Sequence, residues 1–122
     1  MALKDYLAEA ERCSQCSYCK WVPFDQMKSW RFSKGCPSIA YNNFNSYSAR
    51  GRYMVTRALV NKTIKSNEKV LDIANQCCMC GSCDITCKVC RYNLEPLDMI
   101  RELRSELVED GQLLPQHRLY ID

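Results

Sequence analysis

Apolar and charged positions recur with a helical period at the start of the chain. Residues 2–12 carry charged side chains on one helical face, and the opposite face is apolar. The apolar positions are Leu3, Tyr6, Leu7 and Ala10. The pattern predicts a short amphipathic helix that packs its apolar face on the rest of the domain and leads into the first cysteines.

Two more helices are predicted in the middle of the chain. The first opens at Ser48 and runs to about Asn61, and Asn67 is suited to cap the second, which delivers the chain to Cys77. The faces expected to be buried comprise Met54, Val55, Ala58 and Leu59 in the first helix and Val70, Leu71, Ile73 and Ala74 in the second. The stretch 38–48 is rich in Asn, Ser and Tyr, which favour turns over a helix.

The strongest helical pattern lies near the C-terminus. It begins at Asn93 or Glu95, has Pro96 in its first turn and ends at Gly111. The face expected to be buried comprises Leu97, Ile100, Leu103, Leu107 and Val108. The charged residues of the outer face, expected to be solvated, are Arg101, Glu102, Arg104, Glu106 and Glu109. Residues 112–122 are expected to form an extended tail that lies against a neighbour.

The composition is that of a small domain whose core needs a covalent cross-link or a bound metal for stability. The 122 residues suffice for a single domain, 1–122, and ten of the residues counted as apolar are cysteines, so the conventional core is small. The N-terminal segment lacks the apolar run of a secretory signal or a transmembrane segment, so we expect a cytoplasmic protein. In a reducing compartment, closely spaced cysteines favour metal ligation over disulfides. A net charge of +3 allows an acidic protein partner and is too small to indicate nucleic acid.

Cysteines are concentrated between positions 77 and 90. Six of the ten lie in these fourteen residues. Four of them have the spacing C-x2-C-x2-C-x3-C, which wraps a cubane iron–sulfur cluster: Cys77, Cys80, Cys83 and Cys87. In such a motif the first three thiolates bind one cluster and the fourth points to a second cluster. The motif therefore predicts a partner motif elsewhere in the chain.

The partner motif lies near the N-terminus. It consists of Cys13, Cys16 and Cys19, again two residues apart, and of Cys36, which stands before Pro37. If each fourth cysteine serves the opposite cluster, one cluster takes Cys13, Cys16, Cys19 and Cys87, and the other takes Cys77, Cys80, Cys83 and Cys36. Because every iron then has a cysteine ligand, the expected chemistry is electron relay without catalysis.

Two stretches between the motifs have more than one interpretation. Sixteen residues separate Cys19 from Cys36; they carry Trp21, Phe24, Trp30 and Phe32 and are expected to form a long loop. We favour hydrophobic cover for a cluster over a surface that contacts a redox partner. The basic residues of the predicted helix after Ser48 are Arg50, Arg52 and Arg57. A solvated face, or positive charge and hydrogen bonds offered to an anionic cluster, is favoured over phosphate or nucleic-acid binding.

Alternatives to a two-cluster relay remain open. A rival register pairs Cys80 and Cys83 with Cys87 and Cys90. The cysteines could form a structural zinc-binding interaction module, although zinc sites usually use two separate C-x2-C pairs. An iron–sulfur enzyme subunit with an exchangeable iron, using the extra thiols Cys78 or Cys90, is a third possibility. A disulfide framework is the least favoured.

The paired cysteine motifs, separated by a helix that opens with Ser48-Ala49-Arg50-Gly51-Arg52, resemble the α-helical two-cluster ferredoxin domain. This domain occurs in the iron–sulfur subunits of heterodisulfide reductase, of anaerobic glycerol-3-phosphate dehydrogenase and of succinate dehydrogenase or fumarate reductase. The resemblance extends from Cys13 to about Gly111. It implies an α-helical ferredoxin fold with two cluster-binding cysteine loops and two [4Fe-4S] clusters. It also implies partners among flavin-, tungsten- or heterodisulfide-reductase-like redox subunits in a hetero-oligomeric complex of anaerobic metabolism.

The sequence departs from this family at four points. Sixteen residues precede the fourth cysteine of the first motif, where the family has three, and Lys88 replaces the usual proline after Cys87. Cys78 and Cys90 are extra thiols. Many larger relatives continue into cysteine-rich domains with catalytic or noncubane clusters, and such a domain does not follow here, which puts disulfide-reducing activity in doubt. We therefore expect electron transfer from this chain.

Overall fold

Helices make up most of the computed structural model, which describes residues 3–22, 26–29, 31, 33–89 and 94–118. The α-helices are α1 (Leu7–Arg12), α2 (Pro37–Asn42), α3 (Ala49–Val60), α4 (Glu68–Asn75), α5 (Ser82–Val89), α6 (Pro96–Glu109) and α7 (Pro115–Arg118). Short 3-10 helices are η1 (Leu3–Tyr6), η2 (Tyr18–Lys20) and η5 (Asn45–Tyr47). Among these described residues there is no strand, only an isolated antiparallel bridge between Trp21 and Lys34.

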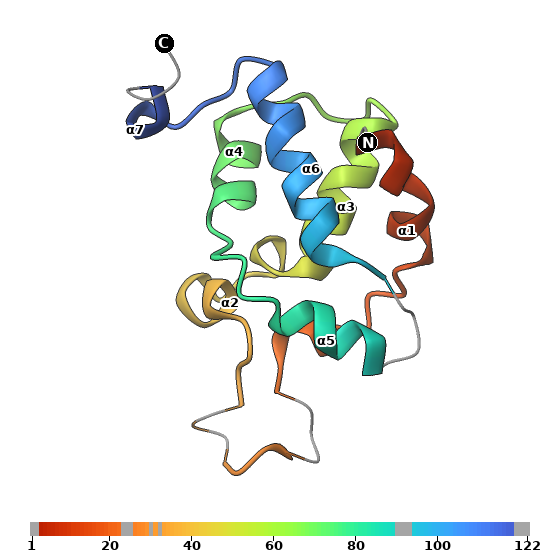
Figure 1. Ribbon diagram of the computed structural model, residues 1–122, viewed down its shortest axis with the longest axis vertical. Coiled ribbons are helices and arrows are strands. Elements are labelled where there is room, and N and C mark those ends of the chain that lie inside the picture. Colours follow the sequence, from red (N-terminus) through yellow and green to blue (C-terminus); the bar gives the residue numbers. More distant parts are fainter. Residues whose placement is uncertain (1–2, 23–25, 30, 32, 90–93, 119–122) are drawn as a thin grey trace.

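The upper part of the molecule is a small helical bundle, in which α6 lies between α4 and α3, and α1 packs on α3 (Figure 1). One core cluster joins η1, α4 and α6 through Leu3, Val70, Leu71, Ala74, Leu103 and Leu107. A second cluster consists of Tyr6, Ala10, Tyr53, Leu94, Met99 and Ile100. Three cysteines pack against this second cluster, namely Cys13, Cys77 and Cys87. The core of the bundle therefore borders the cysteine loops directly.

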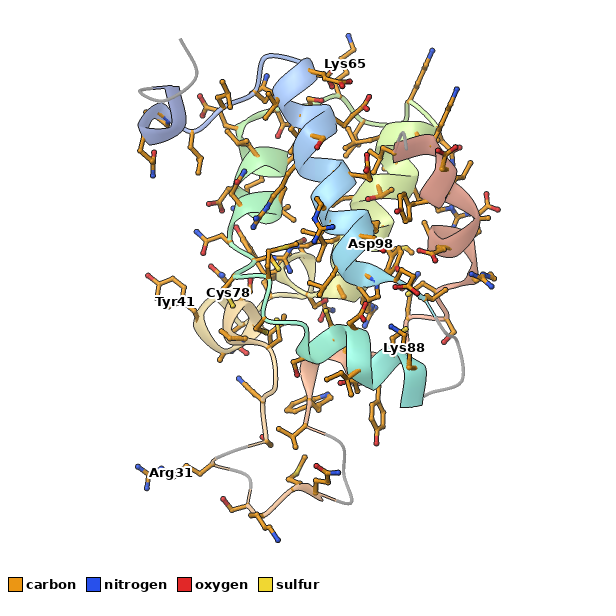
Figure 2. All side chains as sticks on the ribbon, viewed as in Figure 1. Arg31, Tyr41, Lys65, Cys78, Lys88 and Asp98 are labelled. Atoms are coloured by element: carbon orange, nitrogen blue, oxygen red, sulfur yellow. The ribbon has the colours of Figure 1, made fainter. Side chains whose placement is uncertain are left out.

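The other end of the molecule carries α2 and α5, and a long loop projects beyond them (Figure 1). Helix α5 packs on η2 and on α6. The loop leaves and re-enters the domain through two backbone hydrogen bonds, from Val22 N to Ser33 O at 2.7 Å and from Gly35 N to Lys20 O at 2.9 Å. Arg31 lies on its projecting part (Figure 2). Of the helices in the described ranges, none is both long and apolar enough to span a membrane.

The sequence-based prediction of a mostly helical fold is confirmed. The four predicted helices correspond to η1 with α1, to α3, to α4 and to α6. Their start signals act as expected: Ser48 Oγ accepts a hydrogen bond from Gly51 N, and Asn67 Oδ1 accepts from Lys69 N and Val70 N. Pro96 is the first residue of α6. All four residues expected to face inward from α4 are buried.

Three predictions about local structure are wrong. The stretch 38–48 forms α2 and η5, because Pro37 opens a helical turn and Asn43 ends it in the left-handed conformation. The tail contains the short helix α7. Val108 is 44% exposed, while Met99, which the pattern missed, is fully buried in α6.

The buried face of α3 also differs from the prediction. The four apolar residues expected there are half-buried. The fully buried positions of the helix are instead Ala49, Gly51, Arg52, Tyr53 and Thr56. The reason is that α1, α6 and η5 pack on different sides of α3, so its environment is not that of a helix with one apolar stripe.

Candidate functional site

The two cysteine-rich loops have the same unusual backbone conformation. In the first loop, Gln15 and Ser17 have φ angles of 61° and 67°; in the second, Met79 and Gly81 have φ angles of 60° and 85°. In both loops these residues stand immediately before and immediately after the second cysteine. Three of the four are not glycine, and each such residue costs about 1–2 kcal/mol in the left-handed region. This repeated cost indicates that the loop shape serves a purpose.

Both loops then enter a helical turn at the same point. The first enters η2 at Tyr18, and the second enters α5 at Ser82. Cys19 and Cys83, the third cysteines, are therefore each the second residue of a helical turn. The two turns pack against each other, which brings the two motifs together.

The loop conformation aims backbone N–H groups at the cysteine sulfurs. Met79 N donates a hydrogen bond to Cys77 Sγ at 3.3 Å. At the equivalent place in the first loop, burial raises the pKa of Cys13, and a backbone hydrogen bond from Gln15 and the nearby charge of Arg50 partly offset that rise. Alternation of right- and left-handed residues commonly forms such N–H concavities, which bind anions, including iron–sulfur clusters.

Cys13, Cys16, Cys19 and Cys87 line one cavity, here called the Cys13 cavity. It encloses about 390 Å³ of empty space, part of it open to solvent. Tyr53, Leu94 and Pro96 contribute apolar walls. The first three cysteines come from the N-terminal loop, and α5 supplies the fourth. These are the four residues that the spacing of the motifs predicts as one ligand set.

Cys36, Cys77, Cys80 and Cys83 line a second cavity, here called the Cys77 cavity, and Cys78 lines it as well. It has about 330 Å³ of empty space, part of it open to solvent. Cys36 reaches it from the N-cap of α2, and its Sγ donates a weak hydrogen bond to Tyr47 O at 3.9 Å. The sixteen-residue loop before Cys36 thus leaves the domain and returns to it, so the long spacing does not prevent this cysteine from joining the second motif.

Helix α5 connects the two cavities. Cys83 lines the Cys77 cavity and Cys87 lines the Cys13 cavity. Residues four apart lie on the same face of a helix, about 6 Å apart along its axis. Ala49, at the start of α3, lines both cavities. The two cavities are therefore close neighbours.

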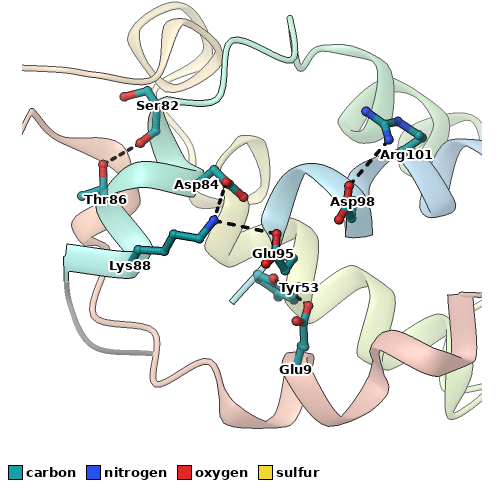
Figure 3. A network of polar contacts seen from close by, with 9 residues as sticks. All are labelled: Glu9, Tyr53, Ser82, Asp84, Thr86, Lys88, Glu95, Asp98 and Arg101. Atoms are coloured by element: carbon teal, nitrogen blue, oxygen red, sulfur yellow. Dashed lines mark hydrogen bonds and ion pairs between the residues drawn. The ribbon is translucent and has the colours of Figure 1, made fainter. Parts of the chain in front are cut away.

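Lys88 makes one ion pair within α5 and one with the residue that precedes α6 (Figure 3). Lys88 Nζ lies 2.7 Å from Asp84 Oδ2 and 3.8 Å from Glu95 Oε2, which precedes α6. These ion pairs are partly exposed and contribute little stability, so they mainly orient the helix. Below them, Tyr53 Oη donates to Glu9 Oε2 at 3.3 Å and ties α3 to α1 beside the Cys13 cavity.

Burial makes the thiolate forms of several cysteines unfavourable. Burial raises the pKa of Cys19 to about 11, despite a hydrogen bond from the backbone of Arg50. Burial, and to a lesser extent the neighbouring thiolates, Cys19 foremost, together raise the pKa of Cys83 to about 12. Four thiolates in one such cavity need a positive charge among them, and metal ions supply one.

An arginine holds each loop in place. At the first loop, Arg50 Nη1 donates to Ser17 Oγ at 2.6 Å, and Nη2 donates to Gln15 Oε1 at 3.2 Å. At the second loop, Arg104 Nε donates to Ala74 O at 3.0 Å, and its Nη2 donates to Cys77 O. The prediction that Arg104 is an ordinary solvated charge is therefore wrong. Helical periodicity could not reveal this contact, because the acceptors lie about 30 residues away.

The remaining cysteines and aromatic residues stand outside the two predicted ligand sets. Cys78 (labelled in Figure 2) is exposed, as Cys16 and Cys80 are, and also lines the Cys77 cavity. Cys90, Phe24, Trp30 and Phe32 lie outside the described residues, and Trp21 is half-buried. Cys80 and Cys87 line different cavities, so the described cysteines are not arranged in the rival register.

The described side chains can be compared with the arrangement that one metal ion requires. Within the ranges that the structure describes, no group of three or more His, Cys, Asp and Glu side chains is arranged to hold one metal ion. The four cysteines of each set are instead spread around a cavity.

Comparisons of the chain with protein-family models, with curated proteins and with solved structures find no match.

Proposed function

We propose that this chain is an electron-transfer iron–sulfur subunit that holds two [4Fe-4S] clusters, one in the Cys13 cavity and one in the Cys77 cavity. One observation carries the proposal: cysteines from distant parts of the chain surround two cavities, and each cavity includes the fourth cysteine of the opposite motif, with Cys78 as an additional lining residue of the Cys77 cavity. That exchange is the ligation pattern of two-cluster ferredoxins. We accordingly propose the α-helical ferredoxin fold for this domain.

The shape of the cavities favours a cluster over a zinc ion. A zinc ion binds four thiolates at about 2.3 Å, so its ligands must converge on one point. The cysteines here surround a volume instead, and the described side chains include no convergent group of three. The N–H groups directed at Cys77, and the equivalent ones at Cys13, suit an anionic guest.

The residues around the cavities have separate tasks in this proposal. When bound, a [4Fe-4S] cluster supplies one-electron redox chemistry. The eight cysteines hold the irons and leave no ligand position for a substrate, which favours relay over catalysis. The apolar walls, Tyr53 and Leu94 on one side and Leu97 on the other, restrict the access of water. The shared residue Ala49 and the helix α5 keep the two ligand sets adjacent.

We further propose that the chain works in the cytoplasm within a hetero-oligomeric oxidoreductase complex of the heterodisulfide-reductase-like type. Its partners would be flavin-, tungsten- or heterodisulfide-reductase-like redox subunits. Support for this partner class comes from the resemblance of the cysteine motifs and of the Ser48–Arg52 segment.

The test is to measure iron and acid-labile sulfide per chain in anaerobically purified protein, together with an EPR spectrum after reduction. We expect about eight irons and eight sulfides, with two magnetically interacting reduced centres. Zinc without sulfide would overturn the proposal and leave a structural interaction module. A substrate-induced change in the spectrum of the isolated chain would instead indicate an enzyme subunit with an exchangeable iron.

A matched control uses the cysteine that the proposal does not need. Cys78→Ser should retain the full iron and sulfide content, because the four other cysteines that line the Cys77 cavity suffice to bind a cluster and Cys78 does not fit the regular spacing of the motif. Loss of half of the iron in this variant would contradict the proposed ligand set.

A further inference from the structure

Arg52 is a buried cation that is held in one position. Its side chain, on α3, is 1% exposed. Nε donates to Ile73 O at 2.8 Å, Nη1 donates to Tyr47 O at 2.9 Å, and Nη2 donates to Ser38 Oγ at 3.0 Å. These acceptors belong to α4, η5 and α2, so the guanidinium is fixed by three separate elements and lines the Cys77 cavity.

All three acceptors are electrically neutral. Arg52 takes part in none of the ion pairs found between described residues. A buried charge without an opposite charge is unfavourable even when it is hydrogen-bonded. An arginine in this position therefore needs a source of negative charge nearby.

The cysteines of the Cys77 cavity are that source. Arg52 lines this cavity together with Cys36, Cys77 and Cys83. An anionic cluster held by these cysteines would attract the guanidinium. Fully buried in the wall, Arg52 is the strongest candidate to balance negative charge inside the cavity.

The Cys13 cavity has a different electrostatic environment. Its arginine, Arg50, is only half-buried, and its hydrogen bonds go to the loop side chains Gln15 and Ser17. Water and salt screen a charge in that position more than they screen a buried one. Although each cavity has an arginine in its lining, only the Cys77 cavity has one inside the low-dielectric interior.

From this difference we infer that Arg52 is the internal counter-charge of the Cys77 cavity and gives the cluster bound there a higher reduction potential than the cluster in the Cys13 cavity. The inference rests on the proposed function. Reduction adds one electron and no bond changes, so the reduced state carries one more negative charge. A fixed positive charge in a low-dielectric site stabilises that state preferentially. An electron that enters the chain therefore rests at the Cys77 cavity.

The experiment is a potentiometric titration of the full, anaerobically purified chain, followed by EPR. We expect two midpoint potentials in the unmodified protein. The variants Cys16→Ala and Cys80→Ala assign them, because each removes a ligand from one cavity only. Arg52→Gln should lower the higher midpoint, which belongs to the Cys77 cavity, and leave the other nearly unchanged. The matched control Arg50→Gln should cause a smaller shift, confined to the lower midpoint.

Failure of the inference differs from failure of the proposed function. Unmodified protein without iron and sulfide would refute the function itself. If Arg52→Gln keeps its full iron content and both midpoints are unchanged, or if the lower midpoint belongs to the Cys77 cavity, the inference is wrong.

The glutamine variant could lose iron for purely structural reasons, since it cannot make all three hydrogen bonds. In that case chemically synthesised protein with citrulline in place of Arg52 decides the question. Citrulline keeps the planar shape, with Nε and one terminal nitrogen still able to donate two of the three hydrogen bonds, and has no charge. A lowered upper midpoint in that protein supports the inference, and an unchanged one refutes it.

Discussion

Gln15 and Met79 occupy equivalent positions in the two cysteine loops and have nearly identical left-handed backbone angles, with φ of 61° and 60°. Their side chains have little in common, and neither favours this conformation. The shared geometry is therefore imposed by the loop as a whole, which directs its N–H groups toward the preceding cysteine. Unfavourable backbone conformations that recur in this way are typical of functional sites.

Gly81→Ala should weaken the second loop through its backbone. Gly81 has φ of 85°, while the added Cβ would meet only Leu97 Cδ1, at 3.4 Å. The strain is thus conformational and should cost about 1–2 kcal/mol. We expect a lower thermal unfolding midpoint, measured by circular dichroism, together with faster loss of iron from the Cys77 cavity.

Gly111→Ala is the control for that variant. Gly111 has a similar φ of 83° with no atom within 4 Å of the added Cβ, and it lies outside both cavities. It should lower the unfolding midpoint comparably without affecting iron retention. Equal iron loss in the two variants would show that overall stability, and not loop shape, governs retention.

In the proposed ligand scheme the fourth cysteine of each motif binds the cluster of the other motif, so mutating it should affect that other cluster. Cys36→Ser should perturb the cluster held by the second motif, and Cys87→Ser the cluster held by the first motif, because each cysteine lines the cavity of the opposite motif. Cluster-resolved EPR of the two variants measures this. If Cys36→Ser altered only the signal that Cys16→Ala also removes, the ligand scheme would be wrong.

Arg104→Ala should destabilise the protein more than a substitution at its exposed neighbour. Arg104 donates to the carbonyls of Ala74 and Cys77, and hydrogen bonds from a charged donor contribute about 1.5–3 kcal/mol each when buried, less where solvent reaches them. We expect a loss of about 1–3 kcal/mol in urea unfolding. Arg101→Ala should change it by less than about 0.5 kcal/mol, because Arg101 is 68% exposed and its pair with Asp98 is 3.6 Å long. Similar losses would refute a specific role for Arg104.

Gly51→Ala tests the close contact between α3 and η5. A Cβ at position 51 would lie 2.1 Å from Asn45 O and 2.6 Å from Ser46 Cα, both backbone atoms that cannot turn away. The helix would have to move, at a cost of about 3 kcal/mol or more. We expect poor folding yield and a marked drop in the unfolding midpoint. A variant as stable as the unmodified protein would show that α3 and η5 pack differently.

Much of the candidate site could be predicted from the cysteine spacing alone. Regular intervals of two residues define each loop, and the rule that the fourth cysteine crosses over assigns Cys87 and Cys36 to the opposite motifs, whose cavities they line. Cys36 was the harder case, because a sixteen-residue loop separates it from its motif. Only the folded chain shows that the base of this loop is closed by backbone hydrogen bonds, which return the chain to the domain.

Local signals in the sequence by themselves determined the main helices, their caps and the grouping of the cysteines. Ser48, Asn67 and Pro96 act within a few residues of their own positions, and helical periodicity is likewise a local property. Tertiary structure alone decided which arginines are buried. The partners of Arg52 come from Ser38, Tyr47 and Ile73, and no sequence period connects these positions. The acceptors that fix the Arg52 side chain come together only when the helices pack. Its burial therefore cannot be predicted from the sequence and is seen only in the folded structure.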